Sequence, residues 1–247
     1  MSGNNIIENY NAVRLGIKDL SLNSESVPEL LVVSKYQSVE DIRLLHEYTG
    51  HTDFGENYVQ ELLYKSEKLP RTIRWHFIGS LQSNKAKALL SIPNLEVFET
   101  LDSVKTAELL NKLCYGREKP LKVMIQIKTS NEDTKSGIGV SSVPELFEFV
   151  MSECKNLSFY GLMTMGNSDP ELTSNFNCFE IMLKLKEKIT RLYLERYSNN
   201  LSFNCKLSMG TSRDMDIAIK NKSNQIRIGT AIFGKERKTV KATRGEE

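Results

Sequence analysis

A lysine follows directly on an apolar run near the start of the chain. In the segment LLVVSK (30–35), Lys35 comes after four aliphatic residues and a serine, as at the carboxyl end of a buried strand. Withdrawal from water favours the neutral amine, which is the form that attacks an aldehyde to give a Schiff base. Lysines at strand ends often extend to solvent with no chemical role, so this position indicates a nucleophile only together with other features.

Two segments near the end of the chain combine glycines with hydroxyl side chains. They are SMGTSRD (208–214) and RIGTAIFG (227–234). Glycines and Ser/Thr residues at the start of a helix expose backbone N–H groups and hydroxyls that bind phosphate. Tight turns and helix caps need the same residue types, so the segments fit either a phosphate site or ordinary turns.

Polar residues also follow four other apolar runs. The segments are FGENYVQE (54–61), FIGSLQSNK (77–85), TSNEDTKSG (129–137) and GLMTMGNSD (161–169). Asn57, Ser80 and Thr164 are candidates to line a pocket, although each could equally cap a helix or form a turn. The four cysteines and three histidines have no metal-ligand spacing, so we expect buried reduced thiols and no metal.

The elements that would position these residues alternate between strands and helices. Apolar runs predict eight strands, at 30–35, 52–55, 74–80, 95–100, 121–127, 157–165, 203–209 and 225–233. An amphipathic pattern predicts a leading helix over 4–20 and a helical stretch after each of the first seven strands, including 38–48, 103–114, 143–154 and 173–194. Ser38 and Ser142 stand where two of these helices need an N-cap.

The strands are nearly continuous apolar runs, which is typical of parallel strands covered on both faces. Strand–helix alternation predicts an α/β fold, either doubly wound or closed. Eight strands in 247 residues, with no GxGxxG turn after the first, favour a (β/α)8 TIM-type barrel with an extra N-terminal helix. We expect this single domain over residues 1–234 and a polar tail over 235–247. The barrel would bring Lys35 and both glycine-rich segments to one mouth.

Composition excludes several classes of protein. The hydrophobic share of 40% and the charged share of 26% are ordinary for a globular protein. The net charge of +2, from 33 basic and 31 acidic residues, is too balanced to predict a nucleic-acid or membrane partner. No apolar run approaches the roughly 20 residues of a spanning helix, and the first residues resemble neither a signal nor a transit peptide. We therefore expect a cytosolic protein.

A lysine that forms an imine, opposite a phosphate site, fits two kinds of ligand. One is pyridoxal 5′-phosphate (PLP), which carries both an aldehyde and a phosphate. The other is a phosphosugar in a Schiff-base aldolase. The residue types by themselves leave both open.

A resemblance to a known family separates the two. The motifs LLVVSK, FGENYVQE, WHFIGSLQSNK, TSNEDTKSG, GLMTMG, LSMGTSRD and IRIGTAIFG occur in this order. From about Leu30 to Gly234 they resemble the signature of the PLP homeostasis proteins. These are single-domain relatives of the alanine racemase barrel, so the resemblance implies an alanine racemase N-terminal domain-like fold.

The resemblance also implies a cofactor site. Lys35 would carry PLP as a Schiff base, Arg227 would face the pyridine nitrogen, and Asn57 and Ser80 would line the pocket. The positions that match the phosphate-holding residues of the family are Ser208, Gly210, Thr211, Ser212, Gly229 and Thr230. The family usually has SMGMS where this chain has SMGTS. At Thr211 the backbone, rather than the side chain, is therefore the group that could bind the phosphate.

The implied function is a carrier or buffer in PLP homeostasis rather than an enzyme. The related racemases take a second acid/base residue from an extra β domain, which we do not expect in a chain ending 13 residues after Gly234. The charge of Arg227 would also disfavour protonation of the pyridine nitrogen. The alternative is a PLP-dependent racemase, lyase or transaminase of low activity. We expect a monomer whose partners are PLP and, by transfer, the apo forms of PLP-dependent enzymes.

Overall fold

The computed structural model describes residues 3–22, 24, 26–129, 136–166, 172–197 and 203–234, and the polar tail predicted over 235–247 lies outside them. The strands are β1 (Glu29–Val33), β2 (Asp53–Glu56), β3 (Arg74–Phe77), β4 (Leu95–Leu101), β5 (Leu121–Lys128), β6 (Ile138–Gly139), β7 (Leu157–Met163), β8 (Lys206–Ser208) and β9 (Gln225–Ile228). The helices are α1 (Gly3–Leu20), α2 (Val39–Thr49), α3 (Val59–Lys68), α4 (Ala86–Leu90), α5 (Val104–Leu113), α6 (Val143–Glu153), α7 (Leu172–Arg196), α8 (Met215–Lys220) and α9 (Thr230–Phe233).

Strands β1, β2, β3, β4, β5, β7, β8 and β9 close into a barrel. Each pairs with the next in this order and β9 pairs with β1, in parallel throughout. The closing register aligns Leu31 with Arg227 and Val32 with Ile228. The prediction of a (β/α)8 TIM-type barrel is therefore confirmed.

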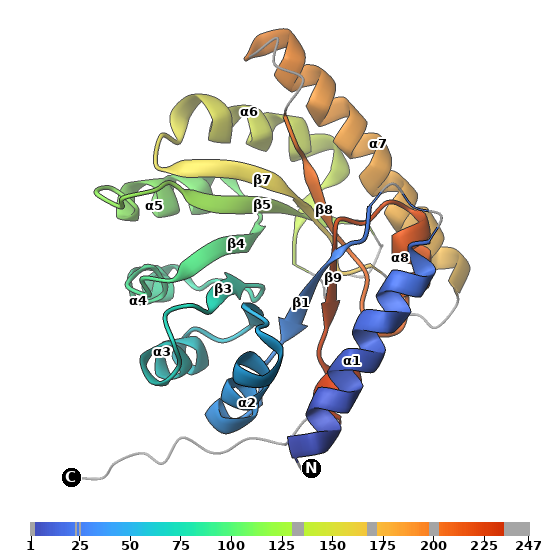
Figure 1. The fold of residues 1–247 in the computed structure, drawn as a ribbon. Coiled ribbons are helices and arrows are strands. Elements are labelled where there is room, and N and C mark those ends of the chain that lie inside the picture. Colours follow the sequence, from blue (N-terminus) through green and yellow to red (C-terminus); the bar gives the residue numbers. More distant parts are fainter. Residues whose placement is uncertain are drawn as a thin grey trace, which may run out of the picture.

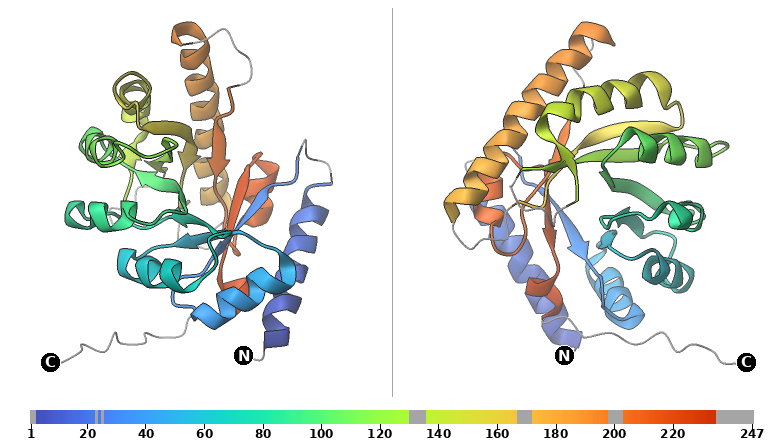
Figure 2. Two further views of the ribbon diagram at one scale, coloured as in Figure 1. Left: turned by 60° about the vertical axis from the view of Figure 1, so that its left-hand side comes forward. Right: turned by 180° about the vertical axis from the view of Figure 1, so that it is seen from behind.

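Helices cover the outside of the barrel. Figure 1 shows them around the strands, with α1 alongside α8, and α1 also contacts α9. The two views of Figure 2 show the same arrangement from other sides. The extra N-terminal helix predicted from the sequence is confirmed. None of the helices in the described part of the chain is long and apolar enough to cross a membrane.

In the part of the chain that the structure describes, the buried apolar residues form two clusters. The larger one fills the layer between strands and helices and includes the buried rings of Phe54, Phe147 and Phe179. The smaller one consists of Val97, Met124 and Met163. Because side chains alternate along a strand, Glu99 of β4 shares a face with Val97. The interior of the barrel is therefore partly apolar and partly charged. All four cysteines are buried, as expected.

Local details differ from the sequence-based expectation. Strand β1 ends at Val33, so Lys35 stands in the turn after the strand rather than closing it. The strand predicted over 225–233 is wrong beyond Ile228, because α9 buries Ile232 and Phe233 through one helical turn. The short strand β6, which pairs with β5, was not predicted.

The two predicted helix caps have opposite outcomes. Ser38 is confirmed, since its hydroxyl accepts from the backbone N–H of Asp41 at 3.0 Å. Ser142 is wrong as a side-chain cap, because it ends a 3-10 turn (Val140–Ser142) and makes no capping hydrogen bond. The 3-10 turn continues directly into α6, so the helix begins there without a side-chain cap.

Candidate functional site

A cavity of about 500 Å³ opens at the carboxyl ends of the barrel strands. Its walls come from the segments that end or follow β1, β2, β3, β7, β8 and β9. Seven of the ten predicted site residues line it, namely Lys35, Asn57, Thr211, Ser212, Arg227, Gly229 and Thr230. The other described lining residues are Val33, Gln37, Ile78, Met165, Arg213, Ala231 and Gly234. The fold thus gathers the lysine and both glycine-rich segments at one mouth.

The other three predicted residues do not line this cavity. Ser80 is exposed and shares a hydrogen bond with Ser136 at 2.8 Å. Ser208 is fully buried, and its hydroxyl donates to Glu99 at 2.8 Å. Gly210 has φ +100°, and a Cβ there would lie only 2.5 Å from a neighbouring methyl group. Ser208 and Gly210 therefore support the cavity from the packed interior.

Lys35 occupies the second position of a tight turn. The carbonyl of Ser34 accepts from the N–H of Gln37 at 3.0 Å, which closes the turn around Lys35 and Tyr36. Lys35 is half-buried, and its Nζ lies 5.8 Å from the centroid of the Tyr36 ring. A cation at this distance from a ring face is attracted to it. The turn places the lysine on the cavity wall next to an aromatic side chain.

Arg227 also lines the cavity, although it is only 3% exposed. Its guanidinium donates to the carbonyl of Thr164 at 2.7 Å and to the hydroxyl of Ser208 at 2.8 Å. Ser208 donates in turn to Glu99, whose other oxygen is 2.6 Å from Nδ1 of His76. Strands β4 and β8 are not neighbours in the ring, so the contact between Glu99 and Ser208 crosses the barrel interior.

The charged side chains in this series of interior contacts alternate in sign. Burial opposes a charge on His76, but its hydrogen bonds with Asp53 and Glu99 outweigh burial and raise its pKa to about 9. Burial alone would raise the pKa of Glu99, yet His76 and Arg227 produce a net lowering. The pKa of Asp53 is likewise lowered, because His76 and Arg74 outweigh its burial. Positive and negative groups therefore follow one another from the cavity to the opposite end of the barrel.

The cavity is positively charged. Among its described lining residues, those that carry a charge are Lys35, Arg213 and Arg227, and all three are basic. The cavity is thus suited to an anionic ligand.

The loops after β8 and β9 form the wall of the cavity next to the turn that carries Lys35, because β9 pairs with β1 and β8 pairs with β9. Oδ1 of Asp214 accepts from both the N–H and the hydroxyl of Thr211, at 2.7 and 2.8 Å, so this residue is held in place by its own loop. Helix α9 begins at Thr230, and the carbonyl of Gly229 accepts from the N–H groups of Ile232 and Phe233, at 2.9 and 3.0 Å. A Cβ on Gly229 would lie 2.9 Å from a backbone oxygen of β1, so the first and last strands of the barrel approach closely here.

Comparison with known proteins agrees with the resemblance in the sequence. The family model for the N-terminal domain of alanine racemase matches residues 7–237. The pyridoxal phosphate homeostasis protein of Schizosaccharomyces pombe is 41% identical over 207 residues, covering 83% of this chain and 83% of its own. The Homo sapiens protein of the same name is 38% identical over 224 residues, covering 87% of this chain and 79% of its own. This chain belongs to the pyridoxal phosphate homeostasis protein family.

A solved structure shares the fold of this PLP homeostasis family member. PipY of Synechococcus elongatus, determined with PLP bound, superimposes with a TM-score of 0.77. It is 24% identical in sequence, and the match covers 93% of this chain and all of PipY. The likeness extends over the whole barrel.

Sequence reasoning missed two groups of charged residues in this family member. Asp53, His76 and Glu99 lie in the barrel interior. Glu56, Glu61 and Lys65 connect the end of β2 to α3 on the outside of the barrel. A usable signal was present, because His76 and Glu99 interrupt strands that are otherwise apolar and covered on both faces. A charge in such a strand requires a partner. The identity of the partner could not be read from the sequence, since it depends on which strands face one another across the barrel.

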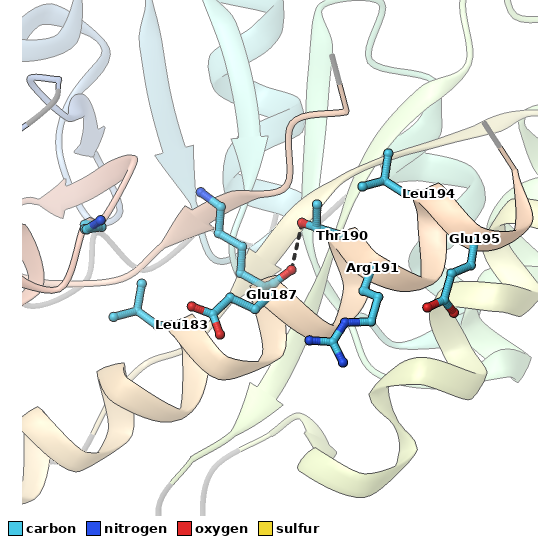
Figure 3. A pocket seen from close by; sticks show the side chains of 8 residues that line it. Leu183, Glu187, Thr190, Arg191, Leu194 and Glu195 are labelled. Carbon is cyan, nitrogen blue, oxygen red and sulfur yellow. Dashed lines mark hydrogen bonds between the residues drawn. The ribbon is translucent and has the colours of Figure 1, made fainter. Parts of the chain in front are cut away.

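A second hollow, of about 690 Å³, runs along the outer face of α7. Figure 3 shows Leu183, Glu187, Arg191 and Glu195 extending from this helix. Lys222, in the loop before β9, also lines it, which places the hollow toward the end of the barrel where strands begin. Barrel enzymes and binding proteins of this architecture use the other end, and the charges here are of both signs. The cavity at the mouth is therefore the candidate site.

Proposed function

We propose that this protein binds PLP through Lys35 and acts as a carrier or buffer in PLP homeostasis. The observation that carries the proposal is that Lys35, Arg227 and the two glycine-rich loops line one cavity, although they are far apart in sequence. The names of the yeast and human relatives, and the PLP in the PipY structure, support the same cofactor.

The residues present fit PLP in size and in chemistry. A cavity of about 500 Å³ lies within the range of small-molecule sites. Three basic side chains suit a ligand with a phosphate dianion. Asn57 also lines the cavity. The groups we assign to the phosphate are Ser212, Gly229 and Thr230, with Ser208 and Gly210 supporting their loops and Ser80 at the rim. Thr211 donates both its N–H and its hydroxyl to Asp214, so its part is to hold the loop.

Lys35 would supply the covalent link, because a lysine amine can condense with the aldehyde of PLP to a C=N bond with loss of water, which needs no oxidant or reductant. The reverse hydrolysis releases the aldehyde intact. A link that forms and breaks without other change is suited to storage and delivery.

We infer that amino acids are not turned over at an enzyme-like rate. Arg227, held by Thr164 and Ser208, would present a fixed positive charge to the pyridine nitrogen and disfavour its protonation. Among the described lining residues there is no carboxylate or histidine to move a proton next to the ring. This inference agrees with the homeostasis role in the names of the relatives.

The absorption spectrum before and after borohydride reduction tests the covalent link. We expect the purified protein to be yellow, and reduction followed by peptide mapping to locate a phosphopyridoxyl group on Lys35. Lys35→Ala should abolish the adduct, whereas Lys85→Ala, in the 3-10 turn after β3, should keep it. An adduct on another lysine, or none, would overturn the assignment.

Product formation tests the absence of turnover. The loaded protein is incubated with a panel of amino acids, and enantiomer exchange, keto acid release and CO₂ evolution are followed. A turnover number near the enzyme median of about 10 s⁻¹ on any of them would show an enzyme. Transfer to apo-enzymes, a monomeric state and a cytosolic location stay predictions.

A further inference from the structure

The turn that carries Lys35 has an unfavourable backbone conformation. Tyr36, at its third position, has φ +62°, in the left-handed region. Glycine and asparagine are the usual residues there, and a bulky side chain persists only where its surroundings hold it. Apart from Lys222, no other non-glycine residue in the described part of the chain has a positive φ. Something must therefore hold this turn.

Two charged residues of α3 contact the backbone of this turn. Nζ of Lys65 donates to the carbonyl of Ser34 at 2.7 Å, and Oε1 of Glu61 accepts from the N–H of Tyr36 at 2.7 Å. These backbone atoms belong to the two peptide groups that flank Lys35. The backbone on both sides of the lysine is therefore anchored to one helix.

Glu56, at the end of β2, completes the cluster. Its Oε1 accepts from Nζ of Lys65 and from the hydroxyl of Ser34, both at 2.7 Å. Nζ of Lys65 also donates to Glu61 at 2.6 Å. Glu56 is 0% and Lys65 is 2% exposed. Because a buried charge that loses its partner is strongly unfavourable, the cluster resists rearrangement.

We propose that Glu56, Glu61 and Lys65 are positioning residues that hold Lys35 in the orientation from which its Nζ attacks an aldehyde in the cavity. The proposal rests on the proposed function, since it requires Lys35 to bind PLP. None of the three lines the cavity, so their effect passes through the turn. A displacement of about 1 Å in a reacting group can slow a reaction by a factor of about 100. The geometry of the turn should therefore affect the rate of imine formation at Lys35.

Three variants separate positioning from general stability. Glu61→Ala removes the acceptor for the N–H of Tyr36. Glu61→Gln is the conservative rescue, because its amide oxygen can accept the same hydrogen bond. Glu180→Ala is the matched control, since Glu180 also pairs with a lysine four residues on, at 2.8 Å, on the exposed face of α7.

Two measurements are made on the apoprotein. The first is the rate of imine formation with PLP, followed by absorbance in stopped flow. The second is the dissociation constant of pyridoxine 5′-phosphate, which has the ring and phosphate but no aldehyde. We expect Glu61→Ala to slow imine formation about tenfold or more, with Glu61→Gln and Glu180→Ala close to wild type. The dissociation constant should change less than about twofold in all three, because Lys35 forms no bond with this ligand.

The outcomes are distinguishable. No imine in the wild type overturns the proposed function, and the positioning role with it. A normal wild-type reaction with an equal rate in Glu61→Ala overturns the positioning role alone. Equal losses of rate and of pyridoxine 5′-phosphate affinity show a structural role and also overturn it. If Glu61→Ala shows no cooperative melting, Glu61→Asp replaces it. This variant keeps the charge beside Lys65, but its shorter side chain does not reach the N–H of Tyr36 as well. A wild-type rate of imine formation in Glu61→Asp would contradict the proposal.

Discussion

Raising the pH should destabilise this protein through His76, a buried residue of the barrel interior. Its folded-state pKa is about 9, against an ordinary value of 6.5, because Asp53 and Glu99 hold its charged form. Below pH 6.5 the native and unfolded states both bind the proton, so the stabilisation is complete. Between 6.5 and 9 only the native state keeps it, and the free energy of unfolding falls as the pH rises. Above 9 the contribution is lost.

The magnitude follows from the width of this window. One pKa unit corresponds to about 1.4 kcal/mol, so the rise from 6.5 to about 9 corresponds to about 3 kcal/mol. His76 is 4% exposed, so screening by solvent reduces this only slightly. The pKa values of Asp53 and Glu99 are lowered, and both stay ionised across the window. The loss is a large part of the stability of an ordinary domain, which is about 5–15 kcal/mol.

Urea unfolding between pH 6 and 9.5 measures this effect, with the fluorescence of Trp75, the single tryptophan, as the signal. His76→Gln should be less stable than the wild type at pH 6. Between pH 6.5 and 9 its free energy of unfolding should change much less with pH than that of the wild type. His46→Gln, on α2 outside the barrel interior, is the control and should keep the wild-type slope. Equal slopes in the wild type and His76→Gln would refute the assignment of the charge to His76.

Two further variants, one double and one single, probe the surroundings of the cavity. Replacing both Ser212 and Thr230 with Ala should weaken PLP retention about tenfold or more, since a charge-assisted hydrogen bond is worth roughly 1.5–3 kcal/mol; an unchanged dissociation constant would place the phosphate elsewhere. Gly79→Ala should lower the free energy of unfolding by about 1–3 kcal/mol and weaken pyridoxine 5′-phosphate binding, because its Cβ would lie 1.8 Å from the backbone oxygen of Asn57. Gly139→Ala, where nothing lies within 4 Å of the added Cβ, is the matched control, and equal effects of the two would contradict the steric argument.

The architecture could be predicted from the sequence because its signals are local. Continuous apolar runs and amphipathic stretches alternate along the chain, and the resulting order of elements admits few folds. The cap at Ser38 was readable for the same reason, since its hydroxyl bonds a group three residues away. Ser142 has the same residue type in the same position, but the 3-10 turn before α6 alters its backbone, and no residue type announces that turn.

The site could be predicted only in part, because its contacts are distant in sequence. Lys35 and Arg227 follow from strand ends and the family resemblance, and the structure gathers both in one cavity. The bond between Ser208 and Glu99 joins residues 109 apart across the barrel, and no spacing rule encodes it. The anchoring of Tyr36 by Glu61 depends on how α3 packs over the turn after β1, which is a tertiary relation.

The closing pair of the barrel, β1 with β9, has a consequence for biosynthesis. Leu31 aligns with Arg227 in that pair, so Lys35 meets the adjacent wall of its cavity only after almost the whole chain has been made. Contacts of such sequence separation form late and slowly, because a long loop must close first. A nascent chain on the ribosome would therefore expose its lysine without the loops after β8 and β9 and hold no cofactor. A ligand that binds only the closed ring stabilises it by mass action. PLP supply would then influence how much of the newly made chain persists in the folded form.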